Sequence, residues 1–131
     1  MYDQDVNARR GIAQLALKGF FSLSRRWRLT RPEAMTLLGL TATSTYANWK
    51  NGRTGTIPRD TLERISYLLN IDERLRQELE TDAQIVQWLR HSTTEQHRTA
   101  PLTIMLQGNV IDIHWVQTHL ETLLEGALEQ S

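Results

Sequence analysis

The chain of 131 residues contains no cysteine, only three prolines and no excess of either charge. The absence of cysteine excludes disulfides, thiolate metal ligands and a cysteine nucleophile, and it fits a reducing compartment. No apolar run approaches the length of a membrane span, and the acidic, polar N-terminus does not have the composition of a secretory signal. We therefore expect a cytoplasmic protein without a membrane segment.

Signals for strands and for common catalytic sites are also missing. No apolar residues alternate with polar ones over the length of a strand. Phosphate-cradling glycine loops, nucleophile elbows and calcium loops are absent. His114 and His119 are five residues apart, so they do not share a helix face as a pair of metal ligands would. The sequence favours an all-α protein that is not an enzyme and holds no metal or cofactor.

The zero net charge hides a division between the two halves of the chain. Residues 1–60 hold 10 Lys and Arg against 4 Asp and Glu, a balance of +6, whereas residues 61–131 hold 5 against 11, a balance of −6. A basic half is what a phosphate-binding module needs, whereas an acidic half is repelled by nucleic acid. Chance segregation is the alternative, and the position of the motif described next argues against it.

The pattern of residues 30–52 predicts two short helices joined by a tight turn. Thr30 and Glu33 have the spacing of a capping box, in which each side chain bonds to the backbone of the other residue. Gly39 supplies the permissive backbone that ends a helix. This is the spacing of a helix-turn-helix, and it lies in the basic half of the chain.

The second helix of the pair carries most of the side chains that we expect to contact DNA. Thr41 or Thr43 can cap its start, and Asn51-Gly52 ends it. Hydroxyls and amides reach base edges, while cations neutralise phosphate charge. A helical hairpin in an ordinary bundle has the same spacing, and the basic charge of this half of the chain favours nucleic acid over that alternative. The residues expected to contact DNA are Thr43, Ser44, Thr45, Asn48, Lys50, Asn51, Arg53 and Arg28.

Apolar residues at helical spacing predict further helices on both sides of this pair. One runs from Arg9 to about Trp27, and its basic end, residues 25–28, is expected to contact phosphates or to complement the helix C-terminus. Further helices are expected at 59–69, ended by Asn70, and in a short segment that Asp72 caps. Three more are expected at 83–90, 101–108 and 110–128, and residues 91–100 are expected to form an exposed loop.

Three stretches of the second half resemble the Xre/MbcA/ParS antitoxin family. They are Leu62 to Ile71, Trp88-Leu89-Arg90, and Pro101 to Gly108. In that family an Xre-like helix-turn-helix is followed by a toxin-binding domain. The resemblance implies an N-terminal helix-turn-helix bundle that binds DNA at residues 1–80, and a small helical domain for toxin binding and dimerisation at residues 81–131.

The resemblance also implies a function. It implies the antitoxin of a type II toxin–antitoxin system, which neutralises a partner toxin by direct binding and represses its own operon as a homodimer. The implied partners are operator DNA and a toxin resembling a RES-domain enzyme or an ADP-ribosyltransferase. The run 91–100 lacks the Pro, Asn, Phe and Gly that family members usually have there, so the toxin's identity stays open. Besides the loop 91–99, the residues expected to bind toxin are Trp88, Leu89, Arg90, His91, Arg98, Pro101 and Leu102.

Other interpretations of the same residues stay open at this point. Plain core packing explains Trp88 and Leu102 as well as toxin contact does. The whole chain is alternatively a stand-alone helix-turn-helix repressor whose C-terminal half only dimerises. A third alternative is an adaptor that has kept the fold and binds no DNA.

Overall fold

The computed structural model describes the backbone of residues 2–94 and 97–130, and the side chains of residues 9–94 and 97–126. Eight helices and no strand lie in these backbone ranges, so the predicted all-α class is confirmed. None of these helices is apolar enough over a sufficient length to cross a membrane. The helices are α1 (Tyr2–Arg26), α2 (Arg31–Leu38), α3 (Thr43–Lys50), α4 (Arg59–Glu78), α5 (Asp82–His91), α6 (Pro101–Met105), α7 (Val110–Thr118) and α8 (Leu120–Gln130).

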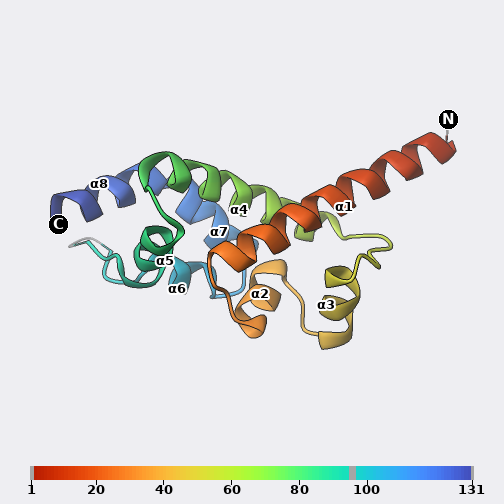
Figure 1. The fold of residues 1–131 in the computed structure, drawn as a ribbon, viewed down its shortest axis with the longest axis horizontal. Coiled ribbons are helices and arrows are strands. Elements are labelled where there is room, and N and C mark those ends of the chain that lie inside the picture. Colours follow the sequence, from red (N-terminus) through yellow and green to blue (C-terminus); the bar gives the residue numbers. More distant parts are fainter. Residues whose placement is uncertain (1, 95–96, 131) are drawn as a thin grey trace.

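Helix α4 runs through the middle of the molecule and packs chiefly against α7 and α1 (Figure 1). Helices α2 and α3 lie beside α1 towards one end, α5, α6 and α8 lie towards the other, and the N-terminal part of α1 extends beyond the body. One cluster of buried apolar residues reaches from Ala13 in α1 to Leu124 in α8. The expected boundary at residue 80 therefore falls between two helices that share a core.

Helix α4 is continuous where the sequence predicts two helices. The prediction that Asn70 ends one helix and Asp72 caps another is wrong, because α4 continues to Glu78. Asn70 is exposed, while Ile71 and Leu75 continue the buried stripe of the helix. Burial of these apolar side chains stabilises the helix by more than a single asparagine weakens it.

A buried polar contact ties this continuous helix to α1. Asp72 Oδ1 accepts hydrogen bonds from Arg26 Nη1 and from Trp27 Nε1, each at 2.8 Å. Asp72 is 3% exposed and Trp27 is fully buried. Asp72, which the sequence suggested as a helix cap, therefore joins α4 to the end of α1. Its partner Arg26 lies 46 residues earlier in the chain.

The last predicted helix, 110–128, is divided at His119 into α7 and α8. The His119 ring stacks on Trp115 with centroids 4.2 Å apart, and its Nδ1 lies 2.9 Å from the Trp115 carbonyl oxygen. That oxygen also accepts the backbone N–H of His119, so the ring and the backbone of His119 meet at the same carbonyl group. Helix α1 is longer than predicted, because it begins at Tyr2 rather than at Arg9. No proline or glycine precedes Gly11 to interrupt it.

Candidate nucleic-acid interface

The first helix of the predicted pair, α2, is fixed at both ends by its own sequence. Thr30 Oγ1 accepts a hydrogen bond from Glu33 N at 3.2 Å, and Glu33 Oε1 accepts one from Thr30 N at 2.8 Å. These bonds form the predicted capping box. Gly39 ends the helix in the left-handed conformation with φ 77°, also as predicted. The two ends together set the direction in which the chain turns into α3.

Helix α3 is anchored by two aromatic side chains and starts without a side-chain cap. Tyr46 is 5% exposed and Trp49 is 7% exposed, so both face the core. The N-cap residue is Ala42, and no side chain bonds to the first turn. The predicted cap at Thr41 or Thr43 is therefore wrong. The Thr43 hydroxyl does not cap the start of α3, and Thr43 is exposed.

The side of α3 opposite these anchors is open to solvent. Seven of the eight residues expected to contact DNA are exposed, and Thr45 is half-buried. Asn48 and Asn51 present amides, and Lys50 and Arg53 present cations. A helix that reads a major groove needs this combination of an apolar anchored face and a polar accessible one.

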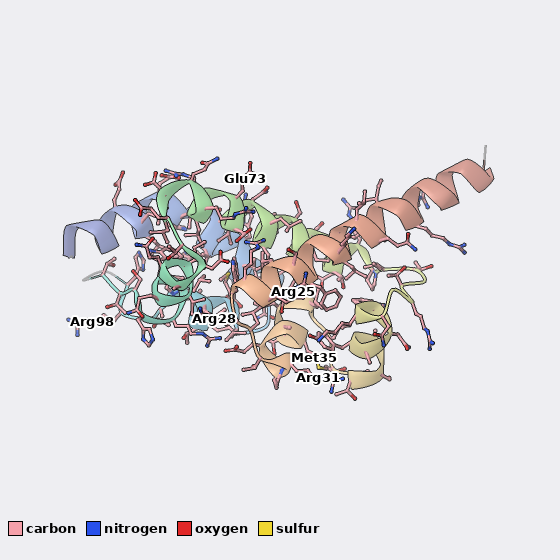
Figure 2. All side chains as sticks on the ribbon, in the orientation of Figure 1. Arg25, Arg28, Arg31, Met35, Glu73 and Arg98 are labelled. Atoms are coloured by element: carbon pink, nitrogen blue, oxygen red, sulfur yellow. The ribbon has the colours of Figure 1, made fainter. Side chains whose placement is uncertain are left out.

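The three arginines at and after the end of α1, Arg25, Arg26 and Arg28, have different surroundings. Arg25 is exposed and lines a hollow beside α3. Arg26 pairs with buried Asp72 and is therefore committed to the fold. Arg28 adopts φ 57° in the connection to α2, and its carbonyl oxygen accepts a hydrogen bond from Arg90 on α5. Figure 2 shows Arg28 on the α5 side of Arg25, so Arg25 is the better-placed cation to act with α3.

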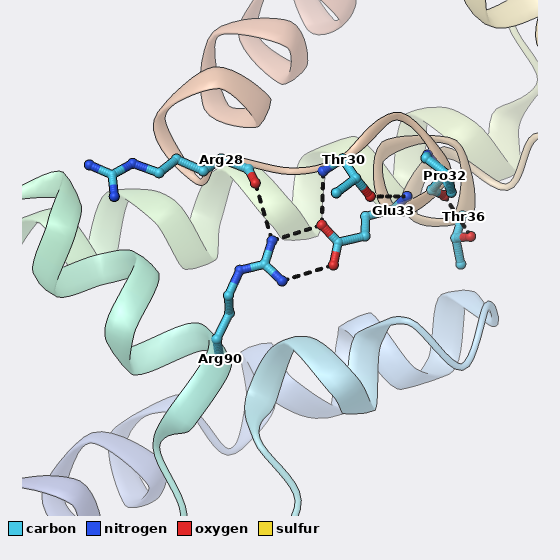
Figure 3. Close-up of polar contacts among 6 residues, drawn as sticks. All are labelled: Arg28, Thr30, Pro32, Glu33, Thr36 and Arg90. Atoms are coloured by element: carbon cyan, nitrogen blue, oxygen red, sulfur yellow. Dashed lines mark hydrogen bonds and ion pairs between the residues drawn. The ribbon is translucent and has the colours of Figure 1, made fainter.

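The residues expected to bind toxin do not share one surface. Leu89 and Leu102 are 1% and 2% exposed, and Trp88 and Pro101 are also buried. The structure thus favours core packing for these side chains. Arg90 is half-buried and its guanidinium contacts Glu33 (Figure 3). Among the expected residues that the structure describes, the exposed ones are His91, Thr93, Arg98 and Thr99.

The loop after α5 is more tightly packed than the expected exposed loop. Thr94 is 8% exposed, and a Cβ atom built on Gly126 of α8 would lie 2.5 Å from its Cγ2 atom. His97 N donates to Thr94 Oγ1 at 2.9 Å, and the His97 ring meets Trp115 edge-on. These contacts hold the loop against α7 and α8. The loop residues 95–96, which belong to the expected toxin contact, lie outside the described residues.

The histidines near the C-terminus have aromatic neighbours. His97 and His119 contact Trp115, and His114 contacts Tyr67. Among the described residues, no three His, Asp or Glu side chains lie together as a group that could hold a metal ion.

Comparison with known proteins agrees with this geometry. Residues 8–70, which include α2 and α3, match the antitoxin Xre-like helix-turn-helix domain. The chain belongs to the Xre-like helix-turn-helix antitoxin family. It is 36% identical over 110 residues to the uncharacterized protein y4oB of Sinorhizobium fredii (strain NBRC 101917 / NGR234), an alignment that covers 84% of each chain. No solved structure matches the chain.

Proposed function

We propose that this member of the family is an antitoxin that binds its own operator through α3 and neutralises a partner toxin through its C-terminal half. The observation that carries the DNA-binding part is the exposed polar face of α3, flanked by unshielded cations, within the matched domain. A toxin resembling a RES-domain enzyme or an ADP-ribosyltransferase is the partner class that the sequence resemblance implies.

In the proposed complex with DNA, residues on α3 divide into two roles. Ser44 and Asn48 contact base edges, because a short hydroxyl and an amide offer both donors and acceptors there. Lys50 and Arg53 contact phosphates and add to affinity without selecting sequence. One helix-turn-helix covers few base pairs, so a homodimer reading two half-sites about one helical turn apart is expected.

Binding to DNA is tested by fluorescence anisotropy with a duplex taken from upstream of the chain's own gene. Asn48→Ala should lower the affinity for this duplex about tenfold and leave binding to unrelated duplex unchanged. Asn70→Ala is the matched control, because Asn70 is an exposed asparagine on α4. Equal effects of Asn48→Ala and Asn70→Ala would remove α3 from the proposed interface.

The toxin partner is tested by co-expression with the product of the neighbouring gene. A stable complex in gel filtration, and toxicity of the neighbour when it is expressed alone, are the expected results. The second candidate function is a stand-alone repressor, which is favoured by the burial of Trp88, Leu89 and Leu102 in the chain's own core. Operator binding together with a harmless, non-interacting neighbour would identify that function instead.

A further inference from the structure

A hollow of about 410 Å³ lies where α1, α2 and α3 meet. Its walls come from the end of α1, the start of α2 and the C-terminal half of α3. Lys50 and Asn51 belong both to this hollow and to the set expected to contact DNA, so it borders the exposed face of α3 directly. The lining residues are Ser24, Arg25, Leu29, Arg31, Tyr46, Ala47, Lys50 and Asn51.

Three cations line the hollow, and no acidic residue does. None of Arg25, Arg31 and Lys50 forms an ion pair with a carboxylate among the side chains that the structure describes. The arginines that do pair, such as Arg26 and Arg90, lie outside the hollow. Like charges gathered at one place repel each other, so an anion in the hollow would lower their electrostatic energy.

The position of Arg31 supports the same conclusion. Arg31 is the first residue of α2, where the helix dipole disfavours a cation. Glu33 in the same turn offsets part of this cost, and an anion beside Arg31 would offset more of it. Arg25, in contrast, lies in the last turn of α1, where a cation is favourable in the absence of any ligand.

The floor of the hollow is the aromatic ring of Tyr46. The ring of Tyr46 is buried and meets Phe21 edge-on, with centroids 5.6 Å apart and an interplanar angle of 72°. Arg31 Cζ lies 5.4 Å from the centroid of the Tyr46 ring, and Lys50 Nζ lies 6.0 Å from it. Tyr46 thus attracts two of the three cations by cation–π contact. The small side chain of Ala47 leaves room above the floor.

We propose that this hollow is a phosphate-binding site, occupied by a backbone phosphate of the DNA that α3 reads. Arg25 and Arg31 hold the phosphate oxygens, and Lys50 closes the site from α3. A phosphate suits it because two guanidinium groups and an ammonium offer many donors and full positive charge. The site extends the contact with the duplex backbone from α3 to α1 and α2. It rests on the proposed DNA-binding function.

The first experiment uses inorganic phosphate and needs no DNA. The ¹⁵N-labelled full chain is titrated with sodium phosphate at constant ionic strength. The backbone amide signals of Arg31, Tyr46 and Ala47 should shift saturably. The shifts should be lost in Arg25→Gln/Arg31→Gln and kept in Arg98→Gln, which removes an exposed cation near α5 and α6, far from Arg25 and Arg31 (Figure 2).

The second experiment measures binding of the same variants to the upstream duplex as a function of salt. Loss of one phosphate contact should reduce the slope of log affinity against log salt by about 0.9, and Arg98→Gln should not change it. Ethylation of one particular phosphate in each half-site should weaken duplex binding by the wild type. Ethylation of the same phosphate should not change duplex binding by the double variant. The single variants Arg25→Gln and Arg31→Gln should each show part of this insensitivity.

The results separate the site from the function on which it rests. One possible result is that the wild type binds the duplex and does not differ from the double variant in its amide shifts, its salt slope or its ethylation pattern. In that case the phosphate site is wrong and DNA binding stands. Amide shifts without duplex binding would support a site for free phosphate and contradict the DNA-binding proposal. If Arg98→Gln lost the amide shifts as fully as the double variant, the site would be overturned as well, because only the total charge of the chain would then matter.

Discussion

Arg90 and Glu33 join the two halves of the molecule through a two-point ion pair. Arg90 Nη2 donates to Glu33 Oε1 at 2.7 Å, and Arg90 Nη1 donates to Glu33 Oε2 at 2.9 Å (Figure 3). The same guanidinium donates to the carbonyl oxygen of Arg28 at 3.1 Å. Because Glu33 also completes the capping box of α2, Arg90 on α5 supports the first turn of the helix-turn-helix.

Removal of this ion pair should destabilise the fold by a measurable amount. Arg90→Ala should lower the free energy of unfolding by about 1 kcal/mol, because the pair is bidentate and only partly exposed. Urea unfolding of Arg90→Ala, Glu33→Ala and the double variant gives the coupling energy between the two side chains. Arg98→Ala, at an exposed arginine, should be neutral. Strictly additive effects of the two single changes would show that the contact contributes nothing.

The same pair gives the stability a defined dependence on pH. The hydrogen bond from Arg90 lowers the pKa of Glu33 below its ordinary value of 4.5. A lowered carboxylate pKa in the folded state contributes stability that is fully present above 4.5 and is lost as the pH falls through the folded-state pKa. The free energy of unfolding of the wild type should therefore exceed that of Glu33→Gln at pH 7, and the difference should shrink below pH 4.5. A difference that stays constant down to pH 3 would contradict this assignment, since pH 3 is about 1.5 units below the unfolded value.

Local signals in the sequence were enough to predict the helix pair. The capping box of Thr30 and Glu33 and the stop at Gly39 act within a few residues, so their effect is visible without knowledge of the fold. Helical spacing also places Trp49, together with Thr45 or Tyr46, on one face of α3, and the structure buries Tyr46 and Trp49.

Signals that depend on distant partners were not predictable in this way. The consecutive arginines 25 and 26 look alike in the sequence, yet only Arg26 meets Asp72, a partner 46 residues away. Asn70 carries a weak local stop signal, which the packing of the neighbouring Ile71 overrides. The hollow beside α3 brings together three helices, and its floor at Tyr46 appears in the sequence only as a core residue.

The turn of the helix-turn-helix should depend strongly on its glycine. Gly39→Ala should lower the free energy of unfolding by about 1–3 kcal/mol, because φ is 77° and an added Cβ would lie 2.9 Å from Arg64 Nε. Arg64 is unable to move aside freely, since it donates to the carbonyl oxygens of Thr36 and Gly108. Gly11→Ala is the matched control, because Gly11 lies within α1 with nothing within 4 Å of the new Cβ.

Thermal unfolding followed by circular dichroism compares the two glycine variants. Gly11→Ala should be neutral or stabilising by about 0.5 kcal/mol, since alanine is the better helix former. Equal losses in both variants would mean that the conformation at Gly39 is not the cause.

The buried carboxylate of Asp72 should be the most sensitive polar group of the core. Asp72→Ala should lower the free energy of unfolding by about 3 kcal/mol, because it leaves the Trp27 indole N–H without its acceptor and Arg26 without its counter-charge. Glu73→Ala, at the next residue of α4, removes an exposed carboxylate (Figure 2) and should change stability by less than about 0.5 kcal/mol. Urea unfolding measures both variants, and a change in the native tryptophan fluorescence should accompany only the first. If the two variants lost equal stability, net charge rather than the contact between α1 and α4 would explain the effect.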